Sequence, residues 1–249
     1  MIDHQNTIVV IPARMASTRL PGKPMADIHG APMIVHVWRR AVEANVGHVL
    51  VAAAESDIAE AVRNAGGDAI MTEAKLASGS DRVAAALALR DRKRQFAHVV
   101  NLQGDLPTID PLAVQRCLAG LTNPGVDIST IAAEITSDDE RDSPNVVKAI
   151  APLSGTREVA FARDFTRTLP PGSPGPWWHH IGIYAYHRSS LEQFVTLPQS
   201  AREKERSLEQ MRALDNGMKI AVVRVDSVPL GVDTFADLER ARSLLKDVA

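Results

Sequence analysis

Apolar runs alternate with amphipathic stretches through the first half of the chain. Short apolar runs predict buried strands at residues 8–11, 48–53, 68–71 and 96–102. Helical patterns follow from Pro32, a residue favoured in a first turn, from Ser56 as an N-cap up to Gly66, and from Ser80 onward. Strands that alternate with helices in this way are typical of βαβ units, so we expect a mostly parallel sheet.

The second half shows a different pattern. Strands are expected at residues 128–135, 146–151, 159–162 and 181–186, without long helices between them. A turn-rich loop at residues 168–178 ends in a Trp pair that must pack against something. Two helices are expected near the end, one around residues 202–215 and one from Thr234, where Thr234 and Asp237 resemble a capping box.

These patterns predict an α/β fold. We expect a single nucleotide-binding domain with a mostly parallel, Rossmann-like sheet and a β-rich insertion toward the C-terminal half. The domain should span residues 1–249, with a nucleotide-binding βαβ half at 1–125 and a second half at 126–249.

Composition narrows the class of protein. A hydrophobic content of 45% and a formal charge of −2 over 249 residues describe an ordinary globule, with no general affinity for nucleic acid or anionic membranes. Cys117 is the single cysteine, so an intrachain disulfide is impossible, and its helical pattern predicts a small core residue. The first six residues lack the regions of a signal peptide, and no apolar stretch approaches the length of a membrane span. We therefore expect a cytoplasmic protein without membrane insertion.

Three cations stand in a loop directly after the first strand. Arg14, Arg19 and Lys23 lie within ten residues of one another. The carboxyl ends of parallel strands are where open α/β sheets bind ligands, and Arg and Lys bind phosphate oxygens well. The P-loop and G-x-G-x-x-G patterns are absent, so the cations must supply what backbone amides supply in those motifs. A solvated basic loop is the alternative, although its prolines and glycine stiffen this segment.

Two carboxylates occupy similar places. Asp105 follows the strand that ends near residue 102, and Asp233 stands between an apolar strand and a helix start. Asp at a helix start is often only a cap, but Thr234 can take that role. Two carboxylates and a triphosphate would complete much of a magnesium site.

Other candidates carry weaker signals. Residues 78–82 open a helix whose N-terminus and hydroxyls suit a nucleotide, although an ordinary capping sequence looks the same. Alternation along the strand around residue 183 puts His180, Gly182, Tyr184 and Tyr186 on one face, where the glycine leaves room for a small ligand. Glu209 and Gln210 alone would be taken for solvated surface.

The motifs together resemble the 3-deoxy-manno-octulosonate (Kdo) cytidylyltransferase family, also called CMP-Kdo synthetases. The resemblance runs almost from end to end of the chain. It rests on motifs at residues 11–24 (IPARMASTRLPGKP), 103–105 (QGD), 144–148 (PNVVK), 180–186 (HIGIYAY), 208–212 (LEQMR) and 231–234 (GVDT), in this order.

The resemblance implies a function and a set of site residues. The enzyme would couple CTP with Kdo, release pyrophosphate and form CMP-Kdo for lipopolysaccharide, by in-line attack of the anomeric hydroxyl on the α-phosphate. It implies Mg²⁺ as cofactor, a homodimer, and a second half that binds sugar and forms the dimer. It assigns Arg14, Arg19 and Lys23 to the triphosphate, Asp105 and Asp233 to the metal, Ser78, Arg82 and Gln103 to the nucleotide, and Arg163, His180, Tyr184, Glu209 and Gln210 to the sugar.

Five positions depart from the family's usual motifs, namely Ala53, Ala54, Lys75, Leu76 and Leu106. Transfer of CMP to a related acid sugar and a non-catalytic nucleotide-binding module are the alternatives that these departures support. A glycosyltransferase is a further alternative, but it would normally carry two Asp residues around one variable position, and residues 104–106 lack the first.

Overall fold

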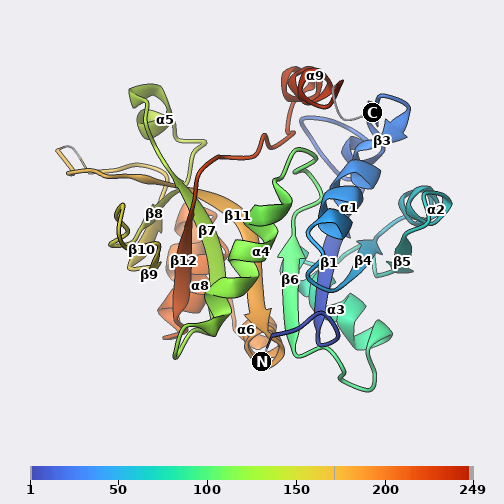
Figure 1. Cartoon of the computed structure of the whole chain (residues 1–249), viewed down its shortest axis with the longest axis horizontal. Helices are drawn as coiled ribbons and strands as arrows, with labels where there is room; N and C mark the ends of the chain where they lie inside the picture. Colours follow the sequence, from blue (N-terminus) through green and yellow to red (C-terminus); the bar gives the residue numbers. More distant parts are fainter. Residues whose placement is uncertain (1, 171, 247–249) are drawn as a thin grey trace. The chain divides into compact units, whose positions relative to one another are not determined.

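The computed structural model describes residues 2–170 and 172–246. They form two compact units (Figure 1): one consists of the chain up to Gln115 together with the chain from Pro229 onward, and the other is Arg116–Val228. Residue 1, residues 247–249 of the expected domain and Pro171 of the turn-rich loop lie outside the described residues.

The first unit contains a parallel sheet in the order β5-β4-β1-β6. Its strands are buried and rich in Val, Ile and Ala, as expected for a sheet that is covered on both faces. This confirms the mostly parallel sheet. The strands of this unit are β1 (Thr7–Ala13), β2 (Asp27–Ile28), β3 (Ala31–Pro32), β4 (His48–Ala53), β5 (Asp68–Met71) and β6 (His98–Leu102), of which β2 and β3 form a separate antiparallel pair.

Helices of the first unit begin close to the expected places. The helices are η1 (Lys23–Met25), α1 (Met33–Glu43), α2 (Ser56–Asn64), α3 (Gly79–Arg90), α9 (Phe235–Leu244) and α4 (Pro111–Ala119), which runs across the unit boundary. Ser78 caps α3 by accepting a hydrogen bond from Asp81 N at 3.2 Å. The prediction of Ser56 as the N-cap of α2 is wrong, because Glu55 holds the extended cap position and Ser56 is the first helical residue.

Helix α9 returns the end of the chain to the first unit. Thr234 and Asp237 form the expected capping box at its start. Helix α9 contacts β2, and its apolar side packs in a core cluster of Leu20, Ile28, Met33, Val232, Leu238, Ala241 and Leu245. Leu20 belongs to the loop that carries Arg14, Arg19 and Lys23, called the cation loop below, so this cluster anchors that loop and the segment of Asp233 to the same core.

The second unit contains a mixed sheet. Strand β7 pairs antiparallel with β11 and parallel with β12, β12 pairs antiparallel with β9, and β8 lies between β10 and β11. Its elements are η2 (Gly120–Thr122), β7 (Ile128–Glu134), α5 (Asp138–Asp142), β8 (Lys148–Ile150), β9 (Val159–Phe161), β10 (Asp164–Thr166), β11 (Trp178–His187), α6 (Arg188–Thr196), α7 (Ala201–Arg206), α8 (Gln210–Asp215) and β12 (Ile220–Val225).

The prediction of a single helix over residues 202–215 is wrong, because two short helices occupy this stretch. The chain leaves the helix at Ser207, whose left-handed backbone (φ 54°) ends α7, and a new helix, α8, begins at Gln210. The break buries Leu208, and it lets Arg212 of α8 form an ion pair with Glu203 of α7 at 2.6 Å, with both side chains almost completely buried. The two short helices are thus held together by a buried ion pair, where one long helix would be held by its backbone hydrogen bonds.

Two smaller expectations about the core are confirmed. Cys117 is completely buried, and burial raises the pKa of its thiol far above its ordinary value. Trp178, at the end of the turn-rich loop, is 2% exposed, and the guanidinium of Arg141 lies over the ring of Trp177. No helix within the described part of the chain combines the length and the apolar character that a membrane crossing requires.

Candidate functional site

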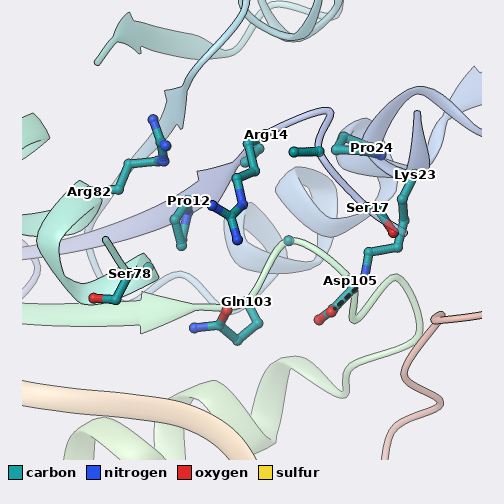
Figure 2. A pocket seen from close by; sticks show the side chains of 13 residues that line it. Pro12, Arg14, Ser17, Lys23, Pro24, Ser78, Arg82, Gln103 and Asp105 are labelled. Atoms are coloured by element: carbon teal, nitrogen blue, oxygen red, sulfur yellow. Dashed lines mark hydrogen bonds and ion pairs between the residues drawn. The ribbon is translucent and has the colours of Figure 1, made fainter. Parts of the chain in front are cut away.

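A polar cavity of about 260 Å³ lies at the carboxyl end of β1 in the first unit (Figure 2). Figure 2 shows the side chain of Arg14 directed into this cavity, above Gln103. The lining residues come from the cation loop, the start of α3 and the turn after β6: Pro12, Ala13, Arg14, Ala16, Ser17, Lys23, Pro24, Ser78, Gly79, Arg82, Gln103, Gly104 and Asp105.

The cation loop has a defined shape because local hydrogen bonds close its second half. Lys23 N donates to Leu20 O at 3.1 Å, and Met25 N donates to Gly22 O at 2.8 Å. Gly22 has a left-handed backbone (φ 69°), which glycine adopts without strain. Buried Pro24 follows, so Lys23 stands on a short rigid turn.

Lys23 joins the two carboxylates that the sequence singled out. Its Nζ donates to Asp105 Oδ2 at 2.8 Å and to Asp233 Oδ1 at 3.1 Å, and Arg19 Nη2 lies 2.9 Å from Asp233 Oδ2. Burial lowers the pKa of Lys23, but the charges and hydrogen bonds of Asp105 and Asp233 outweigh burial and leave this pKa above its ordinary value. Lys23 is therefore an ammonium held between two carboxylates.

Backbone contacts bring Asp105 and Asp233 together. Val232 N donates to Asp105 O at 3.0 Å, and Leu230 N donates to Thr108 Oγ1 at 3.0 Å, so the two segments run side by side. Thr234 Oγ1 accepts from Asp237 N at 3.2 Å and thus caps α9. Since Thr234 takes the cap, the carboxylate of Asp233 is left to contact Lys23 and Arg19, as the sequence suggested.

The turn after β6 allows a close approach of two chain segments. A Cβ at Gly104 would lie 2.9 Å from Pro12 O, which is too short for an ordinary contact, so glycine is required there. Before it, Gln103 Nε2 donates to Asn101 Oδ1 at 3.1 Å. Asn101 is 1% exposed, and it is a positioning residue that the sequence analysis missed; an amide inside a buried strand was the available signal.

Arg82 and Ser78 line the cavity, but both already have partners in the protein. Arg82 is 2% exposed and donates to Thr72 Oγ1 at 2.6 Å, to Glu73 O at 2.9 Å and to Ala74 O at 3.2 Å. The hydroxyl of Ser78 donates to Asp81 Oδ2 at 2.9 Å in addition to its capping role. Arg82 therefore holds the segment before α3 against the cavity wall.

The pair of Asp105 and Asp233 fits a magnesium ion. Both carboxylates reach one point, now shared with the Lys23 ammonium, and Asp105 borders the polar cavity. Mg²⁺ commonly takes one or two carboxylates, with phosphate oxygens and water as further ligands. Within residues 2–170 and 172–246, no group of three or more His, Cys, Asp or Glu side chains is arranged to hold a metal. A metal at this point would therefore depend on ligands from a bound phosphate.

His180 and Tyr184 lie together in the second unit, on β11. Their rings are 5.5 Å apart, and the ring of Phe165 meets His180 edge-on at 4.9 Å. The pairing register of β11 against β7 shifts between Ile181 and Tyr184. Despite this shift, the ring centroids of Tyr184 and Tyr186 are 6.2 Å apart. The shared face expected from alternation is thus present for these three aromatic side chains.

His180 is neutral. Burial lowers its pKa to about 3, with a smaller contribution from His179. Its Nε2 lies 3.0 Å from Thr130 Oγ1, and that hydroxyl donates to Ile183 O at 2.7 Å. Since the hydroxyl has one proton, Nε2–H donates to Thr130, and Nδ1 is left as an acceptor.

Tyr184 and Glu209 are electrostatically coupled. Burial, together with Tyr186 and Glu209, raises the pKa of Tyr184 well above its ordinary value. Gln210 is 6% exposed, and its Nε2 has no hydrogen-bond partner within the described residues. A buried amide nitrogen in this state is costly unless a ligand supplies the acceptor.

Arg163 lies at a cavity of the second unit. It is exposed, and it lines a cavity of about 780 Å³ together with Lys148, Arg206, Trp178 and much of the turn-rich loop. His180, Tyr184, Glu209 and Gln210 are not among the described residues that line this cavity. Lys148 was missed as a structural cation: it is buried and donates to the carbonyls of Ser143, Val146 and Arg167, and the signal was a lysine inside a short strand.

Comparison with known proteins defines the class. A cytidylyltransferase family model matches residues 8–220, and the chain therefore belongs to the cytidylyltransferases. The fold is also that of a cytidylyltransferase from Leptospira borgpetersenii, which superposes with a TM-score of 0.59 at 18% identity, covering 98% of this chain and 88% of that one.

Closer relatives define the particular family. 3-Deoxy-manno-octulosonate cytidylyltransferases of Paramagnetospirillum magneticum and Rhodospirillum rubrum are 55% and 57% identical over 96% of this chain, covering 97% and 95% of their own lengths. The structure of a CMP:2-keto-3-deoxy-manno-octonic acid synthetase complexed with CTP is 37% identical with a TM-score of 0.86, covering 98% of this chain and 99% of that one. The protein is an enzyme of the 3-deoxy-manno-octulosonate cytidylyltransferase family, which confirms the resemblance seen in the sequence.

Proposed function

We propose that this protein transfers CMP from CTP to Kdo and releases pyrophosphate, so that it forms CMP-Kdo for lipopolysaccharide. The observation that carries the proposal is the contact of Lys23 with Asp105 and Asp233 at the edge of a cavity lined by Arg14 and Gln103. Cations and paired carboxylates at one point suit a triphosphate and a divalent ion, and the family relationship supplies the sugar.

The nucleotide occupies the cavity of the first unit. Arg14, Arg19 and Lys23 bind the triphosphate oxygens, because each offers charge-assisted donors from one stiffened loop. The start of α3 at Ser78 and Gly79, with Gln103 opposite, holds the nucleoside end (Figure 2). Arg82 contributes by fixing the segment before α3.

Asp105 and Asp233 would hold Mg²⁺ when CTP is bound. The ion, once bound, supplies positive charge that favours departure of pyrophosphate. The protein's own contribution is to hold both carboxylates in place through the contact of Val232 N with Asp105 O and through the capping of α9. Lys23 keeps the two carboxylates from repelling each other when the phosphates are absent.

Residues of the second unit hold the acid sugar. Arg163 is exposed and offers a guanidinium to the carboxylate. Neutral His180 orients a sugar hydroxyl through its acceptor Nδ1, and the amide of Gln210 donates to another. Tyr184 and Glu209 complete the polar contacts of this group.

The chemistry is one direct displacement. The anomeric hydroxyl of Kdo attacks the α-phosphorus and loses its proton to water, the bond from the α-phosphorus to the bridging oxygen breaks, and pyrophosphate leaves with the negative charge. Arg14, Arg19 and Lys23 hold the charge on the triphosphate as it shifts to the leaving group, and positioning of both substrates supplies much of the rate. No covalent enzyme intermediate is needed.

The proposal also covers the oligomeric state and the cellular location of the enzyme. We place the enzyme in the cytoplasm, where CTP is available, as a homodimer whose contacts come from the second half of the chain. Sedimentation of the purified protein tests the dimer directly.

A pyrophosphate-release screen tests the function. The purified protein is assayed with CTP, UTP, ATP and GTP against Kdo, sialic acid and other 2-keto acid sugars, with Mg²⁺ added or chelated. Release with CTP and Kdo alone supports the proposal. Release with another acid sugar would favour the related-sugar alternative, and CTP binding without release in any combination would favour a non-catalytic module.

A further inference from the structure

Glu55 behaves unlike an ordinary helix cap. It occupies the N-cap position of α2 in extended conformation, but its side chain caps none of the helix's own N–H groups. Ser, Thr, Asp and Asn are the residues that favour this position. The carboxylate instead crosses to the cation loop, where Glu55 Oε2 accepts a hydrogen bond from Met15 N at 2.9 Å.

This contact extends the pairing of β1 and β4 beyond both strands. The two strands are paired in parallel up to Ala13 and Ala53. Ala54 N then donates to Ala13 O at 3.0 Å, and the contact of Glu55 with Met15 follows directly. The side-chain carboxylate thus takes over as hydrogen-bond acceptor where the two backbones separate. It holds the peptide unit directly after Arg14.

The end of β4 also holds the opposite wall of the cavity. Ala53 O accepts from Thr72 N at 2.9 Å and from Thr72 Oγ1 at 3.1 Å. Thr72 Oγ1 in turn accepts from Arg82, the buried guanidinium that lines the cavity. Both walls of the nucleotide cavity are therefore attached to residues 53–55.

Glu55 also supplies negative charge beside two arginines. Burial lowers the pKa of Arg82, the charge of Arg14 lowers it further, and Glu55 opposes both. Arg14 and Arg82 thus repel each other across the cavity, and Glu55 offsets part of this repulsion while no triphosphate is bound.

We propose that Glu55 is a positioning residue for the nucleotide, which fixes the first turn of the cation loop through Met15 N–H so that Arg14 is in place before the triphosphate arrives. A loop already held in its bound conformation loses less conformational entropy on binding. The proposal rests on the proposed function for the identity of the ligand, CTP, but the contact itself is independent of turnover.

Three variants test this proposal. Glu55→Ala removes the acceptor, Glu55→Gln keeps an oxygen that can accept from Met15, and Glu60→Ala removes an exposed carboxylate from the same helix. For each we measure amide hydrogen exchange at Met15 without ligand, the equilibrium dissociation constant for CTP, and the KM for Kdo at saturating CTP.

The expected pattern is specific to a positioning role. Glu55→Ala should exchange the Met15 amide at least about tenfold faster and weaken CTP binding about tenfold, on the scale of one hydrogen bond to a charged acceptor. Its KM for Kdo should stay within about twofold. Glu55→Gln should restore slow exchange and most of the CTP affinity, and Glu60→Ala should match the wild type.

Two outcomes would overturn the proposal. One is an unchanged Met15 exchange rate in Glu55→Ala, and the other is equal weakening of CTP and Kdo together with a lower melting temperature, which would indicate a general loss of structure. A wild-type protein that binds CTP but never releases pyrophosphate would refute the proposed function instead, since exchange and CTP binding do not depend on turnover.

Discussion

Lys23 Nζ lies 2.8 Å from Asp105 Oδ2, although 82 residues separate the two in the chain. The side chain of Lys23 is only 16% exposed, so this ion pair is screened far less than a surface pair. Lys23 of the cation loop and Asp105 therefore depend on each other, and a change in either one disturbs both.

The carboxylate pair should be essential for turnover. Asp105→Asn and Asp233→Asn should each lower kcat at least about a hundredfold, the scale of losing a major electrostatic element of the transition state. Pyrophosphate release across a Mg²⁺ titration measures the effect. Asp110→Asn is a matched control, because Asp110 is exposed and its oxygen accepts from Leu112 N, a role that Asn can keep. Near-wild-type turnover in either folded variant would remove that residue from the metal site.

Lys23→Ala should weaken CTP and leave Kdo largely unaffected. The loss of one charge-assisted phosphate contact corresponds to a rise in the KM for CTP of about tenfold to a hundredfold. Separate titrations of the two substrates measure the effect, and Lys93→Ala, at an exposed lysine outside the motifs, is the control. Loss of sugar affinity with unchanged CTP affinity would contradict the assignment of the cation loop.

Arg163→Ala, and more mildly His180→Ala, should raise the KM for Kdo more than the KM for CTP. The contact of Arg163 with the sugar carboxylate would exist in both ground and transition states, so its loss appears chiefly as weaker binding. Arg157→Ala, at another exposed arginine of the second unit, is the control. A variant with lower thermal stability and unchanged Michaelis constants would show that Arg163 only packs beside the turn-rich loop.

His180 should not titrate over the physiological range. Its pKa of about 3 lies below the unfolded value near 6.5, so the imidazole stays neutral with its proton on Nε2. Histidine ¹⁵N chemical shifts between pH 5 and 8 measure this directly. Because the unfolded chain binds a proton below pH 6.5 and the folded protein does not, His180 should also reduce stability progressively as the pH falls below that value. A shift change centred near pH 6.5 would contradict the buried neutral state.

The ion pair of Glu203 and Arg212 should make the second unit sensitive to acid. Burial alone would raise the pKa of Glu203, but the hydrogen bonds and charge of Arg212 outweigh it and lower the pKa. The stabilisation is therefore present above the unfolded pKa of about 4.5 and is lost as the pH falls through the folded value. Glu203→Ala should cost about 3–5 kcal/mol at pH 7, because Arg212 is buried and loses the carboxylate that lies 2.6 Å from its guanidinium. Thermal unfolding of the wild type and of Glu203→Ala at pH 7 and pH 4 measures this cost. The difference in stability between the two proteins should be smaller at pH 4.

Much of the first unit followed from sequence because local signals there agree with one another. The strand at residues 48–53 and the strand at residues 68–71 begin and end where their apolar runs do. The capping box at Thr234 was likewise readable, since its two residues stand three positions apart.

Two predictions failed, the single helix over residues 202–215 and the cap of α2 at Ser56. Both failed because side-chain contacts outside the local pattern decide the backbone there. The break at Ser207 serves an ion pair between α7 and α8, and the cap at Glu55 serves a hydrogen bond to Met15, 40 residues away. Neither partner can be recognised from the local pattern. The motifs also do not reveal the cavity that Arg163 lines or the Phe165 ring that meets His180, because side-chain direction is not written in the spacing of motifs.

The first unit is interrupted in the sequence by the whole of the second, since it resumes at Pro229. Every residue proposed for the triphosphate and the metal belongs to the interrupted unit, and every residue proposed for the acid sugar belongs to the inserted one. Under these assignments, substitutions within residues 116–228 alter the accepted sugar and leave the triphosphate and metal residues in place. A change of acceptor then needs changes in only one continuous stretch of the chain.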